Sequence, residues 1–292
     1  MTKPKKTVSL VLGSGGARGL AHVGIINWLE EHNYEIKTIS GSSIGALVGG
    51  IYGAGKLDIY VSWITALQKR DVIKLLDFAY SRSGLFSGDR IMQTLNELLG
   101  DTNIEDLPIE FTAVASDLDT EREVWFDRGS LFEAIRASIS IPTIFTPVNH
   151  NGHMLVDGAM LNPIPVAPTL SQMTDLTIAV SLSGKRTNKE EQDDIENPVV
   201  AENKYLAGIS NFIEKIQQKY SSPDIEPAGV FDVILKTYES MQNTITRFKL
   251  AGYNLDHLLE VPSDSCKILE FHKAKEMIDF GYKLAEDNLP KN

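Results

Sequence analysis

The sequence has little cysteine, little positive charge and no long apolar run, and each shortage excludes a class of protein. Its 292 residues include one cysteine, Cys266, so no internal disulfide can form and we expect a reducing compartment. Lysine and arginine together number 28 against 39 acidic residues. The formal charge of −11 argues against a nucleic-acid partner and against simple electrostatic docking on anionic lipid.

The apolar stretches are too short to cross a membrane as a helix, so any contact with lipid is expected to be peripheral. The basic start and the apolar run at 8–12 together resemble a signal peptide, but the run is too brief and ends in glycines. We therefore expect a cytoplasmic protein, with any membrane contact at the inner face. The length favours a single domain, 1–292, with an appended or inserted helical part.

Residues 38–50 have the pattern of a strand end, a tight turn and the start of a helix. Their centre, GSSIG at 41–45, fits the pattern GxSxG. In that pattern the serine lies on a cramped strand-to-helix turn, and glycine on both sides leaves room for the crowded backbone. Ser43 has glycines at both required offsets and Ser42 does not, so Ser43 is the candidate nucleophile. The alternative is a small-residue turn that only packs a helix on a strand.

A second glycine-rich turn, GSGGARG at 13–19, follows an apolar run at 7–12 that is typical of a buried strand. Residues 20–29 then have the pattern of a helix. Backbone N–H groups and the positive end of the helix dipole would converge there on an anion. The anion could be a dinucleotide pyrophosphate, although the glycine spacing is imperfect and no acidic residue ends a second strand. Alternatively, N–H groups near Gly15 and Gly16 could form an oxyanion hole.

The two glycine turns are expected to lie together. Residues 36–40 have the pattern of the second strand, and turns that follow successive strands of an open α/β sheet lie at the edge where ligands bind. Farther along, Asp157 ends the apolar strand at 154–156 and precedes a glycine, so its carboxylate is expected at a sharp bend beside buried surface. A solvated turn aspartate is the alternative for Asp157.

Periodicity and turn residues predict the other elements, which are helices at 57–76, 90–99, 131–138 and 274–289 and strands at 109–116, 124–126 and 176–180. The segment 183–228 combines a polar, acidic loop with an amphipathic helix. Its apolar face would either pack on the domain or act as a lid or membrane contact. Residues 229–292 are expected to add helices that pack on the core, with a last strand at 267–271.

The histidines do not form a distinctive motif. His22 is expected to be packed or solvated, and His150 and His153 lack metal-ligand spacing. A Ser–Asp–His triad in the chain order of α/β-hydrolases would need His257 or His272 after the acid. No loop has the oxygen-ligand spacing of a calcium site, so we expect neither metal nor cofactor.

Three ordered motifs resemble the patatin-like phospholipase family, of the small bacterial type. They are the glycine loop at 13–19, GSSIG at 41–45 and DGA at 157–159, and the segments at 115–118, 136–142 and 162–165 also resemble that family. The resemblance covers most of the chain. One departure is Ser14, where the family loop commonly has a further glycine, and this leaves the donors of Gly15 and Gly16 in place.

The resemblance implies a three-layer α/β/α sandwich with a mostly parallel central sheet, and a Ser–Asp dyad in place of a triad. On the matching positions Ser43 is the nucleophile, Asp157 is its base, and the amides of Gly15 and Gly16 form the oxyanion hole. The implied reaction is hydrolysis of lipid-like carboxylic esters through an acyl-enzyme, without a cofactor. Arg18 would steer an anionic head group or form a surface ion pair.

Two other functional classes stay open. In one, the glycine loop of a phosphate- or nucleotide-binding module holds the ligand and Ser43 is incidental. In the other, the chain is a catalytically silent regulatory adaptor that keeps the fold and works through partners. Ester turnover distinguishes the favoured class from both.

Overall fold

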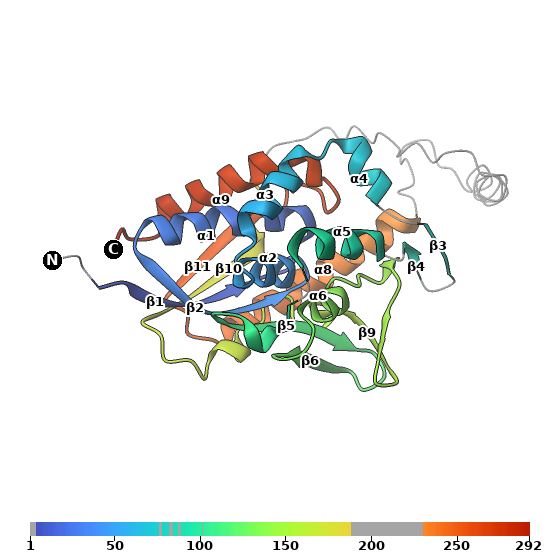
Figure 1. The fold of residues 1–292 in the computed structure, drawn as a ribbon, viewed down its shortest axis with the longest axis horizontal. Coiled ribbons are helices and arrows are strands. Elements are labelled where there is room, and N and C mark those ends of the chain that lie inside the picture. Colours follow the sequence, from blue (N-terminus) through green and yellow to red (C-terminus); the bar gives the residue numbers. More distant parts are fainter. Residues whose placement is uncertain (1–3, 76–77, 82–83, 87–88, 101, 188–229) are drawn as a thin grey trace. The chain divides into compact units, whose positions relative to one another are not determined.

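The computed structural model describes residues 4–75, 78–81, 84–86, 89–100, 102–187 and 230–292 (Figure 1). The chain divides into two compact units, one formed by Met1–Thr187 with Met241–Asn292 and the other by Asn188–Ser240. The predicted segment 183–228, with its polar loop and amphipathic helix, lies outside the described residues except for 183–187. All the candidate site residues lie in the first unit.

A mostly parallel sheet forms the centre of the first unit. Its strand order is β11-β10-β1-β2-β5-β9-β8, and β6 also pairs with β5. The pairs from β11 to β5 are parallel, whereas β6 and β9 run antiparallel to β5. The bounds are β1 Lys6–Leu12, β2 Tyr34–Ser42, β5 Glu110–Asp117, β6 Arg122–Phe126, β8 Val148–His150, β9 His153–Asp157, β10 Leu176–Gly184 and β11 His257–Pro262. A smaller sheet has the order β3 (Phe78–Ser81), β4 (Gly84–Phe86), β7 (Thr143–Phe145).

Helices flank both faces of the large sheet. They are α1 Ala21–Glu31, α2 Ile44–Gly53, α3 Leu57–Ala66, α4 Lys69–Leu75, α5 Asp89–Leu99, α6 Leu131–Ser138, α8 Val230–Ala251 and α9 Ala274–Asn288. Alternate residues of β1 face the two sides, because successive side chains of a strand point in opposite directions. Leu10 belongs to the main core with α1 and α9, whereas Val11 packs in a second cluster against Leu250 of α8. The predicted three-layer α/β/α class is confirmed.

Helices α1 and α9 lie side by side on one face (Figure 1). Their close approach depends on two glycines. A Cβ on Gly24 would lie 1.9 Å from the carbonyl oxygen of Ile278, and a Cβ on Gly281 would lie 2.0 Å from that of Ala21. Because no side chain fits at either position, each helix seats its glycine on the backbone of the other. Among the described helices, none is long and apolar enough to cross a membrane.

Two predicted elements need correction. The helix expected at 57–76 is interrupted, because Leu67 adopts an extended conformation and separates α3 from α4. The last strand is β11, not 267–271: Leu259 and Val261 are buried and β11 pairs with β10. Residues 268–271 instead pass the glycine loop, where the carbonyl oxygen of Ile268 accepts a hydrogen bond from the Ala17 N–H at 2.8 Å. The apolar run at 268–271 therefore packs as a loop, and its local sequence does not distinguish it from a strand.

Candidate active site

Ser43 is the single residue between the end of β2 and the start of α2. Its backbone has φ 56° and ψ −125°, a strained conformation for a residue with a side chain. The neighbouring backbone has no room for side chains: a Cβ on Gly41 would lie 2.4 Å from the Gly45 carbonyl carbon, and a Cβ on Gly45 would lie 2.1 Å from the Leu12 oxygen. The glycines of GxSxG therefore permit the turn in the way that the sequence pattern predicts.

A serine from α6 holds this turn in place. The Ser43 N–H donates to Ser138 Oγ at 2.9 Å, and the Ser138 hydroxyl donates to the Val114 carbonyl of β5 at 2.6 Å. Ser138 is fully buried. Ser138 belongs to the segment at 136–142 that resembles the family, but the sequence predicts no role for it, because nothing local distinguishes a tethering serine from a packed one.

The structure brings Ser43 and Asp157 together. The Ser43 hydroxyl donates to Asp157 Oδ2 at 2.6 Å, and Asp157 Oδ1 accepts the Ala159 N–H at 2.8 Å. Strand β5 makes this contact possible, because it lies between β2 and β9 in the sheet. Its neighbouring residues Val114 and Ala115 pair with Ser42 and Asp157, respectively. The carboxylate 114 positions downstream therefore arrives beside the serine.

Burial sets the acidity of this carboxyl group. Asp157 is 1% exposed and Ser43 is 4% exposed. Loss of hydration raises the pKa of Asp157 to about 7, against the opposing effect of the hydrogen bonds from Ser43 and Ala159. No charged side chain among the described residues is a cause of the shift. A carboxylate with a pKa near neutrality is a far better base than an ordinary aspartate.

The glycine loop (residues 13–19) lies next to the serine turn. Strands β1 and β2 are parallel neighbours, with Leu12 paired to Gly41, so the turns that follow them leave the same edge of the sheet. A Cβ on Gly19 would lie 2.3 Å from Ile44 Cγ2, which shows that the loop packs directly on the first residue of α2. The predicted proximity of the two glycine turns is confirmed.

The backbone N–H groups of the glycine loop differ in their hydrogen bonding. Those of Gly13, Ser14 and Ala17 donate to backbone carbonyls of Val180, Pro163 and Ile268. In the described part of the chain, the N–H groups of Gly15 and Gly16 donate to no protein acceptor. Gly16 has φ +59° and its missing Cβ would lie 2.5 Å from the Ile268 oxygen, so only glycine fits. The oxyanion-hole assignment of Gly15 and Gly16 stays a prediction.

Arg18 lies in the interior of the first unit. This residue is 6% exposed, which disfavours the alternative of a surface ion pair. Its guanidinium Nη1 donates to the carbonyl oxygens of Ser263 at 2.8 Å and Cys266 at 3.3 Å. Arg18 therefore binds the segment that follows β11 to the glycine loop, and its role in steering an anionic head group stays a prediction.

His22 supports the glycine loop from behind, a role that the sequence analysis missed. The ring is fully buried in α1, and its Nε2 lies 2.9 Å from the Gly13 carbonyl oxygen. Burial lowers the pKa of His22 to about 4, so the ring is neutral at pH 7. Because a carbonyl only accepts, Nε2 must carry the proton. The only local sign was a histidine in the first turn of the helix, among the apolar and small residues at 20–26.

Among the residues that the structure describes, one group of side chains has the atoms for a metal site. The ligand atoms of Asp117, Asp119 and His153 lie within 4.8 Å of one another. However, Asp117 already accepts hydrogen bonds from the Asp119 N–H and from Thr120, and Asp119 accepts one from the Met154 N–H. The bonds from Asp119 and Thr120 close the turn between β5 and β6, and the bond from Met154 ties this turn to β9, which accounts for the carboxylates without a metal.

The geometry disfavours a histidine triad. Ser43 Oγ bonds directly to Asp157, whereas a triad places the histidine between the serine and the acid. His257 opens β11 and pairs with Ile178, near the start of β10. Because these strands are parallel to β2, His257 lies toward the edge opposite to the serine turn. His272 lies in a single 3₁₀ turn at Phe271–Lys273.

We accordingly expect that His257→Ala and His272→Ala each leave ester hydrolysis within about twofold of the wild-type rate. Neither ring lies between the nucleophile and its carboxylate. The measurement is kcat/KM on a soluble p-nitrophenyl ester, with the melting temperature as a check on folding. A large loss in a folded variant would transfer the base function to that histidine.

The chain is similar to several known proteins. Lysophospholipase NTE1 of Pyricularia oryzae is 28% identical across 98% of this chain and 18% of its own length. Neuropathy target esterase sws of Drosophila persimilis is 34% identical across 54% of this chain and 12% of its own length. The solved structure of VipD from Legionella pneumophila gives a TM-score of 0.42 at 13% identity, across 98% of this chain and 68% of VipD.

Two further matches extend over enough of the chain to show the family. An uncharacterized NTE family protein of Mycobacterium tuberculosis is 38% identical, across 97% of this chain and 91% of the relative. Residues 10–170 match the family model described as patatin-like phospholipase, and this range contains both glycine turns and Asp157. The chain belongs to the patatin-like phospholipase family.

Proposed function

We propose that this protein is a serine acyl hydrolase that cleaves lipid-like carboxylic esters through the dyad of Ser43 and Asp157. The observation that supports this most directly is the 2.6 Å hydrogen bond from the Ser43 hydroxyl to a buried carboxylate, made from a strained strand-to-helix turn. Strain at a residue with a side chain is typical of functional positions. The second requirement is a set of backbone donors, and the proposal assigns it to the Gly15 and Gly16 N–H groups of the loop that packs on the first residue of α2.

In the proposed reaction, Asp157 Oδ2 takes the proton of the Ser43 hydroxyl while Oγ attacks the ester carbonyl carbon. The carbonyl oxygen becomes an oxyanion that accepts hydrogen bonds from the Gly15 and Gly16 N–H groups. Collapse of this intermediate breaks the bond to the alcohol, which leaves with the proton from Asp157. Water then attacks the acyl-Ser43, with Asp157 again as the base, and releases the carboxylic acid.

The chemistry requires a carboxylate to act as base for an alcohol, and burial is what makes this feasible. A raised pKa brings the proton affinity of Asp157 closer to that of the group it must deprotonate. The oxyanion donors contribute separately, because removal of one such donor typically costs about 2.7 to 4 kcal/mol in the barrier. A lipid-like ester is the substrate class that family membership favours.

The dyad predicts a simple pH dependence for the reaction. Asp157 must be ionised to accept the proton, and its pKa is about 7 in the folded chain. We expect kcat/KM to rise tenfold per pH unit below this value and to level off above it. Initial rates with a neutral ester between pH 5 and pH 9 measure this dependence of kcat/KM on pH. A flat profile through this range would argue against Asp157 as the base.

Labelling with a fluorophosphonate probe tests the nucleophile directly. The probe should modify Ser43, as identified by peptide mapping, because only an activated serine displaces its leaving group quickly. Asp157→Asn should lose the labelling, while His257→Ala serves as the matched control and should keep it. If the folded wild-type protein takes up no probe and turns over no ester, the nucleotide-binding and adaptor alternatives are favoured instead.

A further inference from the structure

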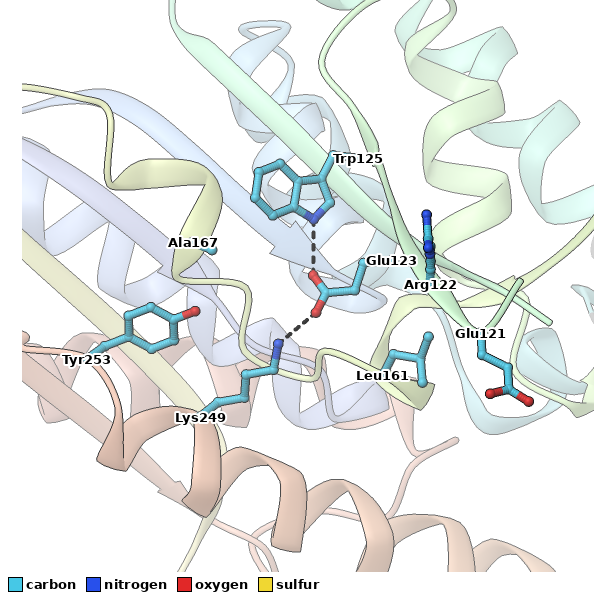
Figure 2. Close-up of a pocket in the computed structure, with 8 residues that line it drawn as sticks. All are labelled: Glu121, Arg122, Glu123, Trp125, Leu161, Ala167, Lys249 and Tyr253. Carbon is cyan, nitrogen blue, oxygen red and sulfur yellow. Dashed lines mark hydrogen bonds and ion pairs between the residues drawn. The ribbon is translucent and has the colours of Figure 1, made fainter. Parts of the chain in front are cut away.

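A half-buried carboxylate outside the dyad gathers three hydrogen bonds. Glu123, on β6, accepts from Lys249 Nζ of α8 at 2.6 Å through Oε1. Its Oε2 accepts from the Asn162 amide at 2.8 Å and from the Trp125 indole at 3.0 Å. Figure 2 shows Lys249 and Trp125 approaching the Glu123 carboxylate from different sides of a surface pocket. These donors outweigh the effect of burial and hold the pKa of Glu123 below its usual range.

Asn162 connects this carboxylate to the turn that follows Asp157. It is 1% exposed, and its backbone N–H donates to the Gly158 carbonyl oxygen at 2.8 Å. The same oxygen accepts the Ser116 hydroxyl at 3.2 Å. A Cβ on Gly158 would lie 2.1 Å from the Val114 oxygen, so this turn is seated tightly on β5. Its position is therefore fixed by Asn162 on one side and by β5 on the other.

The same turn orients the catalytic carboxylate. Ala159 belongs to the 3₁₀ turn Gly158–Met160, and its N–H donates to Asp157 Oδ1, which leaves Oδ2 for the Ser43 hydroxyl. A continuous series of bonded groups thus runs from Lys249 to Ser43. Both ends and every intermediate residue lie in the first unit of the chain.

We propose that Glu123 is a positioning residue for the dyad: it holds Asn162, Asn162 holds the turn at 158–160, and this turn aims the Asp157 carboxylate at Ser43. Lys249 secures Glu123 from α8. The inference depends on the proposed function in one respect, that Asp157 is the base whose orientation matters.

A pH profile separates positioning from mere stabilisation. The hydrogen bonds from Ser43 and Ala159 both lower the pKa of Asp157, and no charged side chain in the described part of the chain is a cause of its shift. Removal of the Glu123 charge should thus have no direct electrostatic effect, whereas displacement of Ala159 should raise the pKa of Asp157 further. A variant that is only less stable, assayed at a temperature where it stays folded, would keep the wild-type pKa in its pH–rate profile.

The experiment compares four proteins with the wild type on a neutral ester. Glu123→Ala should lower kcat about tenfold with little change in KM. It should also move the acid limb, the rising part of the pH–rate profile below the pKa of Asp157, to higher pH by about half a unit or more. Glu123→Gln keeps an acceptor oxygen for Asn162 and should lie closer to the wild type in both respects. Lys249→Met should show a smaller shift in the same direction. Trp125→Phe, the matched control, removes a donor to the same oxygen without touching the turn and should leave the limb unchanged.

The inference would be overturned if Glu123→Ala, or Glu123→Gln if the alanine variant does not fold, showed the wild-type pKa in its pH–rate profile. An equal loss of kcat in Lys249→Met and Glu123→Ala would then indicate a simple structural ion pair. The pKa of Asp157 can also be read from the pH dependence of unfolding, without turnover. If the wild type did not hydrolyse the ester, the proposed function would be contradicted. If unfolding gave the same pKa of Asp157 in Glu123→Ala as in the wild type, the positioning of Asp157 by Glu123 would be contradicted.

Discussion

Ser43→Ala is expected to lower kcat/KM for ester hydrolysis by about 10⁴-fold or more, and Asp157→Asn by a similar factor. The alanine removes the atom that attacks. The asparagine keeps the shape but cannot take the proton from Ser43 Oγ, which it faces at 2.6 Å. Because the two groups act as one unit, the double variant should be scarcely worse than either single variant. Steady-state kinetics with a soluble ester measure all three.

Folding must be verified for this comparison, since both side chains are buried. Ser43→Ala is a small change, and circular dichroism with a melting curve should show a wild-type fold. Asp157→Asn should fold at least as well as the wild type at pH 8, because it removes a buried charge that burial disfavours. Retention of substantial hydrolysis by a folded Asp157→Asn protein would refute the dyad.

The second large effect is on the pH dependence of stability, where Asp157 and His22 act in opposite directions. Burial raises the pKa of Asp157 from 3.8 to about 7. Between about pH 4 and pH 7 the folded chain therefore holds a proton that the unfolded chain has released, so the free energy of unfolding falls as pH rises. As pH rises through this window, the free energy of unfolding of Asp157→Asn should increase by about 4 kcal/mol relative to that of the wild type, at about 1.4 kcal/mol per pH unit.

His22 has the opposite sign. Burial lowers its pKa from 6.5 to about 4, so the unfolded chain takes up a proton that the folded chain does not bind. Its contribution to stability is present above pH 6.5 and is lost as pH falls toward 4. The free energy of unfolding of His22→Gln should therefore fall by about 3 kcal/mol relative to that of the wild type as pH rises from about 4 to 6.5. The wild type should show a shallower dependence than either variant, because the two slopes oppose each other.

Urea unfolding at half-unit steps from pH 4 to pH 8 measures these differences. Each variant is compared with the wild type at the same pH, which cancels the contributions of all other titrating groups. His257→Ala is a suitable control, because its ring lies away from both groups, at the start of β11. If the difference curve for Asp157→Asn is flat, the carboxyl group is not held in an environment that disfavours its charge.

Local patterns predicted much of this molecule correctly. The helix at 131–138 and the strand ending at Asp157 are as expected, because periodicity and turn residues are properties of short segments. The serine turn was predictable for the same reason, since glycine at two fixed offsets is what that backbone requires. The last strand was placed wrongly, because 267–271 and β11 are both short apolar runs and only pairing with β10 distinguishes them.

The sequence alone therefore determined that Ser43 lies on a strained turn beside a glycine loop, because consecutive parallel strands bring their following turns to one edge of the sheet. Only the tertiary structure decided that Asp157 reaches Ser43, that Arg18 is internal, that His22 contacts the glycine loop and that Glu123 accepts a hydrogen bond from Asn162. These contacts join residues distant in sequence, or depend on how fully a side chain is buried. Both are set by how the strands and helices pack together, which no local pattern encodes.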